Sequence, residues 1–149
     1  MKRIAAYKKL FEVDKDMTLS QLKSMYRKLV KEWHPDKFQD GDPMKEEAEI
    51  KSTEIIDAYH FLVSIAPETQ EQHREVYQET ITTSAIADFQ YKGLTLKITF
   101  QNGGVYEYFG VQRNNYNKLI QAPSPERFAR RHIFNAHTYR NVSKAVTAE

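Results

Sequence analysis

The chain has 149 residues, of which 40% are hydrophobic and 28% charged, with a formal net charge of +2 and no cysteine. This length suits one ordinary domain or two small ones, and the lack of cysteine excludes disulfides, thiolate catalysis and thiolate-held zinc. Because no apolar run follows the basic start and none is long enough to span a bilayer, we expect a cytoplasmic protein without signal peptide or membrane segment.

Charge is distributed unevenly along the chain. Residues 1–79 carry 13 Lys/Arg against 16 Asp/Glu, and residues 80–149 carry 9 against 4, so the net charges are −3 and +5. Such a split suggests two units that meet different partners.

The first half shows helical periodicity. A short helical face at residues 7–11 precedes a strong helix start, in which Thr18 suits the N-cap, Gln21 the capping-box position and Met17 the hydrophobic staple with Leu22. The apolar stripe of this helix is Leu22, Tyr26, Leu29 and Trp33, and its opposite face carries Lys23, Arg27, Lys28 and Lys31. Pro35 disfavours helical geometry at His34, so the helix should end near Trp33.

Further elements follow in order. We expect a loop over 38–43, a long amphipathic helix over 44–64, a short polar helix over 68–79 and a linker at 80–83. After residue 84 the apolar period becomes two, which predicts strands at 85–91, 94–100 and 105–111, with a hairpin loop at Asn102-Gly103-Gly104. Helices should follow near 116–120 and from Ser124, an N-cap, with Pro125 at the first helical position.

This pattern predicts an α+β protein. A helical hairpin with short flanking helices fills residues 1–79, and a small antiparallel three-stranded sheet with one or two C-terminal helices fills residues 84–149. Two helices joined by a loop, each with one apolar stripe, should pack antiparallel. That packing leaves the tripeptide His34-Pro35-Asp36 at the exposed tip of the hairpin.

Residues 5–79 resemble the J-domain family of co-chaperones. Tyr7–Val13 is similar to the first helix of the family, Leu22–Lys37 to its second helix and following loop, Ile55–Leu62 to the middle of its third helix, and Arg74–Tyr77 to the end of its fourth. Ser52 stands near a position where the family usually has a core aromatic residue.

The resemblance implies that this half stimulates ATP hydrolysis by a DnaK-type chaperone. It assigns docking on an acidic surface to Lys23, Arg27, Lys28 and Lys31, extended by Lys37, and it assigns signalling to His34 and Asp36, with Pro35 holding the loop. A row of cations also favours fast, salt-sensitive association on physical grounds. The alternative for an arbitrary helix is that the basic face is only solvated and that Pro35 only stops the helix.

Residues 84–142 resemble the KTSC domain family, a small module found at the C terminus of some lysyl-tRNA synthetases. The resemblance rests on Leu94–Phe100 with Asn102-Gly103, on Val105–Val111 with its Tyr106-x-Tyr108 signature, and on Ala122-Pro123-Ser124, Phe128, Ile133 and Tyr139. Glu126 departs from the glycine that the family usually has. Nucleic-acid binding is the role usually suggested for the family.

The length of the hairpin loop decides where Tyr106 and Tyr108 point. A two-residue turn would pair them with Thr99 and Lys97 and expose them, whereas a three-residue loop would pair Tyr106 with Phe100 and Tyr108 with Ile98 on the core face. We favour the core face and a packing role, and a base-stacking platform is the alternative.

A basic stretch follows near the C terminus. It contains Arg127, Arg130, Arg131, His132, Arg140 and Lys144, interleaved with Phe128, Phe134 and Tyr139. These residues suit a nucleic-acid backbone or an acidic protein segment, and Tyr106, Tyr108, Arg127, Arg130, Arg131 and Arg140 are the candidate nucleic-acid or client-binding residues. A solvated helix face, or a contact with the acidic first half, would also account for the stretch.

No catalytic constellation is evident. His132 and His137 are five residues apart, a poor spacing for a shared metal on a helix, and no phosphate-cradling loop or nucleophile elbow occurs. We expect a monomeric co-chaperone with no enzymatic activity, metal or cofactor of its own, partnered by a DnaK-type chaperone and by RNA or a specific protein client. The alternatives are an RNA-binding adaptor with a secondary or degenerate J-domain, and a structural scaffold.

Overall fold

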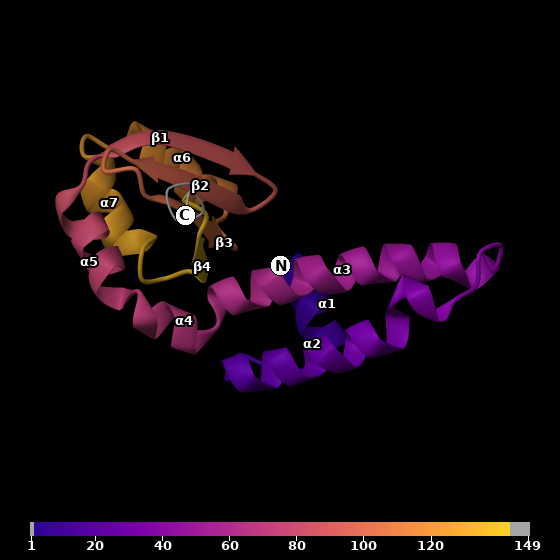
Figure 1. Cartoon of the computed structure of the whole chain (residues 1–149). Helices are drawn as coiled ribbons and strands as arrows, with labels where there is room; N and C mark the ends of the chain where they lie inside the picture. The colour runs from indigo at the N-terminus through magenta and orange to yellow at the C-terminus, as the bar shows by residue number, and fades with distance from the viewer. Residues whose placement is uncertain (1, 144–149) are drawn as a thin grey trace. The chain divides into compact units, whose positions relative to one another are not determined.

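The computed structural model describes residues 2–143, and the chain divides between Glu71 and Gln72 into two compact units. We call residues 2–71 the helical unit and residues 72–143 the sheet unit (Figure 1). The helical unit contains α1 (Lys2–Phe11), α2 (Leu19–Trp33), the 3-10 turn η1 (Pro35–Lys37), α3 (Pro43–Ile65) and most of α4 (Pro67–Gln72). The helices expected at 7–11, from the Thr18 cap to near Trp33, and at 44–64 are therefore present. The second has the expected ends, the third differs by one residue at each end, and the first begins earlier, at Lys2.

The start of α2 has the predicted capping box. The Thr18 hydroxyl accepts a hydrogen bond from the Gln21 backbone N–H at 3.1 Å, and the Gln21 side chain accepts one from the Thr18 N–H at 3.0 Å. Met17 and Leu22, the expected staple residues, are both buried. These contacts satisfy two backbone donors that a helix start otherwise leaves unpaired.

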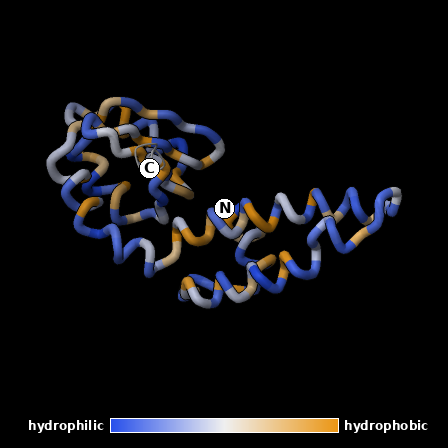
Figure 2. The backbone as a smooth tube through the Cα atoms, viewed as in Figure 1, coloured by the Kyte–Doolittle hydropathy of each residue, from blue (hydrophilic) through white to orange (hydrophobic). Residues whose placement is uncertain are grey.

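Helices α2 and α3 form an antiparallel hairpin, and α1 packs against both. Apolar residues recur along α2 and α3 at helical spacing (Figure 2), and Leu22 and Leu29 of α2 are buried with Ile55 and Leu62 of α3. The rings of Tyr26 and Tyr59 stack with their centroids 4.2 Å apart. Burial of each large aliphatic side chain contributes roughly 1.5–3 kcal/mol, so this seam holds the hairpin together.

The sheet unit has four strands where the sequence analysis expected three. It contains α5 (Arg74–Thr83), β1 (Ile86–Lys92), β2 (Thr95–Phe100), β3 (Val105–Phe109), α6 (Arg113–Gln121), α7 (Pro125–His132) and β4 (Tyr139–Asn141). The sheet is antiparallel with the order β1-β2-β3-β4. Strand β4 was missed because three residues are too few to show an alternating pattern, and it lies inside the stretch that we interpreted by its charge.

One face of the sheet carries the core of the unit. Its members come from the strands and from all three helices, and they include Leu96, Ile98, Phe100, Tyr106, Tyr108, Leu119, Ala129, Ile133 and Phe134. The opposite face carries polar side chains such as Lys97 and Glu107. The expected alternation of β2 is thereby confirmed from Leu96 onward, whereas Leu94 lies in the preceding turn with a φ of 65° and is 45% exposed.

The register of the β2–β3 hairpin places both signature tyrosines on the core face, as we favoured. Tyr106 pairs with Ile98 and Tyr108 with Leu96, which is a shift of two residues from the expected partners. The loop still has three residues, but they are 101–103, because Phe100 N–H donates to the Gly104 carbonyl at 2.8 Å. A shift of two residues keeps each side chain on the same face of the sheet. The predicted burial of Tyr106 and Tyr108 is therefore confirmed, although their cross-strand partners differ from the expected ones.

Helix α5 runs through residues 80–83, where the sequence analysis placed a linker. Its Tyr77, Thr80 and Ile81 are buried, and Tyr77 and Ile81 belong to the core of the sheet unit. The uncharged, β-prone stretch Thr80–Thr83 is helical because tertiary burial outweighs the small propensity differences among Thr, Ile and other residues.

Strand β1 lies at an edge of the sheet and contains an irregularity between Ile86 and Asp88. At its start, the Ile86 N–H donates to a carboxylate oxygen of Glu126 on α7 at 3.0 Å. The helix that provides this carboxylate begins as predicted, with Ser124 as N-cap and Pro125 at its first position. Glu126 therefore ties α7 to the edge strand.

Candidate functional site

The tripeptide His34-Pro35-Asp36 forms a closed turn directly after α2. His34 has extended backbone dihedrals, as expected before proline, and caps η1 with its side chain. The imidazole Nδ1 accepts a hydrogen bond from the Asp36 N–H at 3.1 Å, and the His34 carbonyl accepts one from the Lys37 N–H at 3.0 Å. Because Nδ1 is the acceptor, neutral His34 carries its proton on Nε2.

Both signalling side chains remain accessible to a partner. The His34 side chain is 50% exposed and that of Asp36 is 90% exposed, with Nδ1 and an Asp36 carboxylate oxygen 3.6 Å apart. These two local hydrogen bonds, one to the His34 side chain and one to its carbonyl, therefore hold the turn while leaving the Nε2 donor and a carboxylate free to bind.

Ser52 links this turn to α3. Its hydroxyl donates to the Trp33 carbonyl at 2.9 Å, so it satisfies one of the carbonyls that the end of α2 would otherwise leave unpaired. Sequence reasoning noted Ser52 only as a departure from the family's aromatic residue, and no local pattern pointed to this contact.

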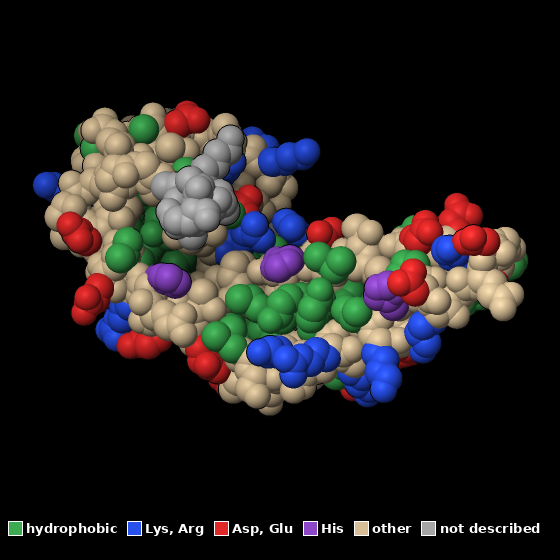
Figure 3. Space-filling view, viewed as in Figure 1, with side chains coloured by type: hydrophobic (Ala, Val, Ile, Leu, Met, Phe, Trp, Pro, Cys, Tyr) green, Lys and Arg blue, Asp and Glu red, His purple; other side chains and the backbone are tan. Residues whose placement is uncertain are grey.

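The predicted docking cations lie on the outer face of α2. Lys23, Arg27, Lys28 and Lys31 are all exposed, and within residues 2–143 none of them forms an ion pair. Figure 3 shows Lys and Arg side chains along the outer edge of α2. Lys37, on η1, is also exposed. The arrangement is a row of uncompensated positive charge that ends at the tripeptide, suited to an acidic partner surface.

A groove of about 510 Å³ borders the tripeptide between α2 and α3. Tyr26 and Val30 line it from α2, Thr53 and Ile56 line it from α3, and His34 stands at its end. Ile56 is 41% exposed. The groove places apolar surface beside the polar tip.

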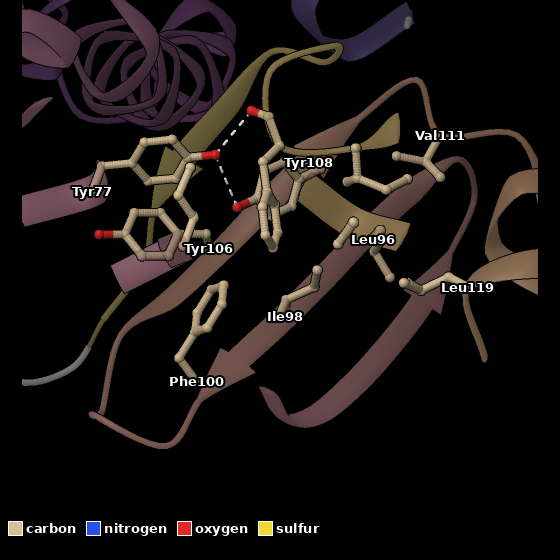
Figure 4. Packing of buried hydrophobic residues seen from close by; sticks show 12 residues of the cluster. Tyr77, Leu96, Ile98, Phe100, Tyr106, Tyr108, Val111 and Leu119 are labelled. Atoms are coloured by element: carbon tan, nitrogen blue, oxygen red, sulfur yellow. Dashed lines mark hydrogen bonds between the residues drawn. The ribbon is translucent and has the colours of Figure 1, made fainter. Parts of the chain in front are cut away.

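The sheet unit does not present Tyr106 and Tyr108 as a binding platform. Their exposed fractions are 4% and 0%, because their strand positions face the helices. Figure 4 shows Tyr77, Tyr106 and Tyr108 gathered in the core. The Tyr77 hydroxyl donates to the Phe134 carbonyl at 2.9 Å and lies 3.1 Å from the Tyr108 hydroxyl. These two candidates are therefore packing residues, as we favoured, and their burial does not fit the alternative of a base-stacking platform.

Burial changes the acidity of this tyrosine cluster. It raises the pKa of Tyr108 well above the usual 10.0 and raises the pKa of Tyr77 and of Tyr106 as well. It also raises the pKa of Tyr139, the residue of β4 that stacks on Tyr77, to about 12. Nothing in the sequence indicated that Tyr77 and Tyr139 contact Tyr108. Tyr77 lies in a segment that we expected to belong to the first domain, and Tyr139 lies in β4, a strand that we did not predict.

The four candidate arginines occupy different environments. Arg140 pairs with Glu107 at 3.2 Å across β3 and β4, and Arg130 donates to the Thr82 carbonyl at 3.1 Å. Arg127 and Arg131 are exposed and line a shared pocket on α7. Lys144 of the basic stretch lies outside the described residues.

Two kinds of feature are absent from the part of the chain that the structure describes. Between residues 2 and 143 no three His, Asp or Glu side chains gather in a metal-binding arrangement. Over the same residues, no helix combines the length and hydropathy that a bilayer crossing requires.

Comparison with known proteins agrees with both resemblances. Residues 6–78 match the DnaJ domain, and residues 82–146 match the KTSC domain. The chaperone protein DnaJ of Thermoplasma acidophilum is 37% identical over 76 residues, which are 51% of this chain and 18% of that protein. That of Thermotoga maritima is 39% identical over 56 residues, 38% of this chain and 14% of its own length. The chain thus spans less than a fifth of the length of these curated relatives.

Proposed function

From the premise that this chain carries a DnaJ domain followed by a KTSC domain, we propose that it is a co-chaperone that stimulates ATP hydrolysis by a DnaK-type chaperone. His34 and Asp36 transmit the signal, and the outer face of α2 docks on the ATPase. The KTSC domain provides the second binding activity, which determines where the chaperone is recruited.

The observation that carries this proposal is the closed turn at the tripeptide. The imidazole of His34 is half exposed, and its Nδ1 accepts a hydrogen bond from the Asp36 N–H, which restricts the ring and leaves Nε2–H as its available donor. A donor held in one orientation can favour one state of a two-state partner, because its interaction free energy differs between the states. Because hydrogen bonds already hold the turn in the free protein, binding should cost less conformational entropy than ordering a flexible loop would.

The test is steady-state ATP hydrolysis by several DnaK-type chaperones, with and without this protein. Wild type should accelerate hydrolysis, and His34→Gln should return it to the unstimulated rate. His73→Gln is the matched control, because His73 is exposed and makes no capping bond through its side chain. Failure of the wild type with every chaperone tried, or equal loss in both variants, would contradict the proposal.

The docking face has its own test. Lys23→Gln with Arg27→Gln should weaken stimulation most at low salt, because the removed attraction is screened as ionic strength rises. Lys9→Gln with Lys15→Gln removes the same charge from exposed sites outside α2. If the two double variants lose stimulation equally, the effect belongs to net charge and not to the α2 face.

A further inference from the structure

We propose that the pocket on α7 binds an acidic peptide segment, in which two carboxylates pair with Arg127 and Arg131 while an apolar side chain fills the cavity beside Phe128. This inference goes beyond chaperone stimulation and does not depend on it. It names the chemistry of a partner for the second binding activity, which the proposed function leaves without a ligand.

The pocket lies where the α6–α7 connection meets α7, and its volume is about 260 Å³. Ala122 and Pro123 line it from the connection, and Arg127, Phe128, Arg131 and His132 line it from one face of the helix. Such a volume is below the range of roughly 300–1,000 Å³ that is typical of small-molecule sites. The cavity is therefore suited to one side chain of a longer ligand, whose charged groups can reach the cationic rim.

Positive charge at the pocket is not compensated within the unit. Arg127 and Arg131 are both exposed, and neither forms an ion pair with a described residue. Glu126, the one acidic residue of α7, already accepts a hydrogen bond from a backbone N–H of β1. Arg130 donates to a backbone carbonyl of α5, so the arginines of α7 that remain available to a partner are the two that line the pocket.

Helix stability does not explain why arginine stands at these two positions. Arg127 lies in the first turn of α7, where its N–H donates to the Ser124 cap and where the helix dipole disfavours a cation. Like charges four residues apart, such as Arg127 and Arg131, also destabilise a helix. A role in binding carboxylates accounts for a placement that the local structure opposes.

The spacing of the two arginines matches an extended acidic segment. Side chains four residues apart on a helix have Cβ atoms about 5–6 Å apart. In an extended peptide, alternate side chains share one face and lie about 6.4–6.8 Å apart, because each residue advances about 3.2–3.4 Å. Carboxylates at alternate positions can therefore meet Arg127 and Arg131 together. Each guanidinium fork can bind both oxygens of one carboxylate, which a point charge cannot do.

The aromatic rim of the pocket favours an aliphatic side chain over a stacked base. Phe128 is half-buried and packs against the core of the sheet unit, and its ring centroid lies 4.7 Å from that of His132, with the planes tilted by 46°. The two rings therefore form no flat platform for a base, whereas an aliphatic side chain can pack on a ring edge. A nucleic-acid strand also requires cations along its backbone. Arg130 and Arg140, the other candidate arginines, are engaged within the unit.

The test uses the full chain and fluorescence anisotropy with a short labelled peptide that carries glutamate at alternate positions and one leucine on the same face. Wild type should bind it with an affinity that falls as salt rises, because the pairs form at exposed positions. A matched peptide with glutamine for each glutamate should bind more weakly on the order of tenfold, since the charge-assisted pairs are lost. A second matched peptide, with alanine for the leucine, should bind more weakly by roughly fivefold, because less apolar area is buried.

Variants of the protein locate the site. Arg127→Gln with Arg131→Gln should weaken binding of the acidic peptide on the order of tenfold at low salt and reduce its salt dependence. The corresponding double lysine variant keeps the charge but loses the planar forks, so its affinity should be intermediate. Lys92→Gln with Lys118→Gln removes the same charge from exposed positions of the same unit, and it should keep most of the affinity. Near-UV circular dichroism confirms that each variant is folded.

Several results would overturn the inference. They are the absence of binding by wild type at low salt, equal binding of the glutamate and glutamine peptides, and an equal loss in the arginine variant and the Lys92–Lys118 control. Unchanged affinity for the alanine peptide would show that no side chain enters the cavity. Tighter binding of oligouridine than of the acidic peptide, abolished by the arginine variant, would assign the pocket to a nucleic acid instead.

Discussion

The Tyr77 hydroxyl lies 3.1 Å from the Tyr108 hydroxyl and donates to the Phe134 carbonyl, so Tyr108 is the donor of the pair. Tyr77 falls inside residues 6–78, which match the DnaJ domain, yet its ring is buried in the core of the sheet unit. The last segment of one family match is therefore a structural element of the neighbouring unit.

Replacement of Tyr77 by phenylalanine should destabilise the sheet unit by about 1–3 kcal/mol, because the Tyr108 hydroxyl and the Phe134 carbonyl would both lose a buried partner. Urea denaturation followed by tyrosine near-UV circular dichroism measures this change. Trp33, the one tryptophan of the chain, reports on the helical unit, and its transition should not move. Tyr116→Phe is the control, since the Tyr116 hydroxyl makes no hydrogen bond to a described residue. A comparable loss in this control would contradict the assignment.

Truncation should locate the start of the sheet unit before α5. A chain beginning at residue 72 should unfold cooperatively, whereas one beginning at residue 82 should not, because it lacks Tyr77 and Ile81. Loss of a single large buried side chain costs about 2–5 kcal/mol, a large share of the stability of a small domain. Thermal unfolding of both fragments by circular dichroism decides the point, and a cooperative transition in the shorter fragment would refute it.

Alkaline pH should destabilise the sheet unit. Burial raises the pKa of Tyr108 well above 10.0 and that of Tyr139 to about 12, so above pH 10 the unfolded chain loses protons that the folded chain keeps. Stability is then fully present below pH 10 and decreases as pH rises further. The decrease should be about 1.4 kcal/mol per pH unit for each buried tyrosine that ionises only on unfolding.

Urea midpoints across this pH range, with tyrosinate absorbance recorded in parallel, measure the alkaline effect. Tyr139→Phe should make the decrease shallower. Ionisation of all tyrosines near pH 10 without unfolding would show that the cluster is not shielded from solvent.

Thr18→Ala should destabilise the helical unit by about 1 kcal/mol, since it removes the capping box at the start of α2. The transition of Trp33 fluorescence in urea measures the loss. Thr53→Ala, at an exposed position within α3, should cause no loss, because alanine is the better helix former there. Equal destabilisation in the two variants would argue against the cap.

Ser52→Ala should cost about 1 kcal/mol and also reduce ATPase stimulation, because the end of α2 that positions His34 would lose its bond to α3. Ser64→Ala is a suitable control, since Ser64 bonds the Phe61 carbonyl of its own helix and lies far from the tripeptide along α3. Unaltered stimulation in Ser52→Ala would show that the turn keeps its geometry without this contact.

Features encoded locally were predictable from the sequence. The Thr18 cap, the end of α2 before Pro35 and the Ser124 cap depend on residues a few positions apart, and all three are confirmed. The burial of Tyr106 and Tyr108 also followed, because the period of a strand fixes the face even when the partner residues are misassigned.

Features that depend on distant partners were not predictable. Membership of α5 in the sheet unit rests on contacts of Tyr77 with residues more than thirty positions away. Ser52 gave no signal for its bond to Trp33, and β4 is too short for periodicity to reveal it. The sequence could not distinguish the four candidate arginines from one another. Only the structure shows that Arg130 bonds the Thr82 carbonyl and that Arg140 pairs with Glu107, whereas Arg127 and Arg131 do neither.

The irregular β1 edge also restricts how the sheet unit can recognise other proteins. A flat exposed edge offers its backbone to any extended chain, which invites both peptide capture and aggregation. Here the register shift between Ile86 and Asp88 interrupts the edge, the Ile86 N–H is already bound by Glu126, and Asp88 and Lys92 add exposed charge. Strand addition at β1 is therefore disfavoured, and selectivity at this edge must come from side chains.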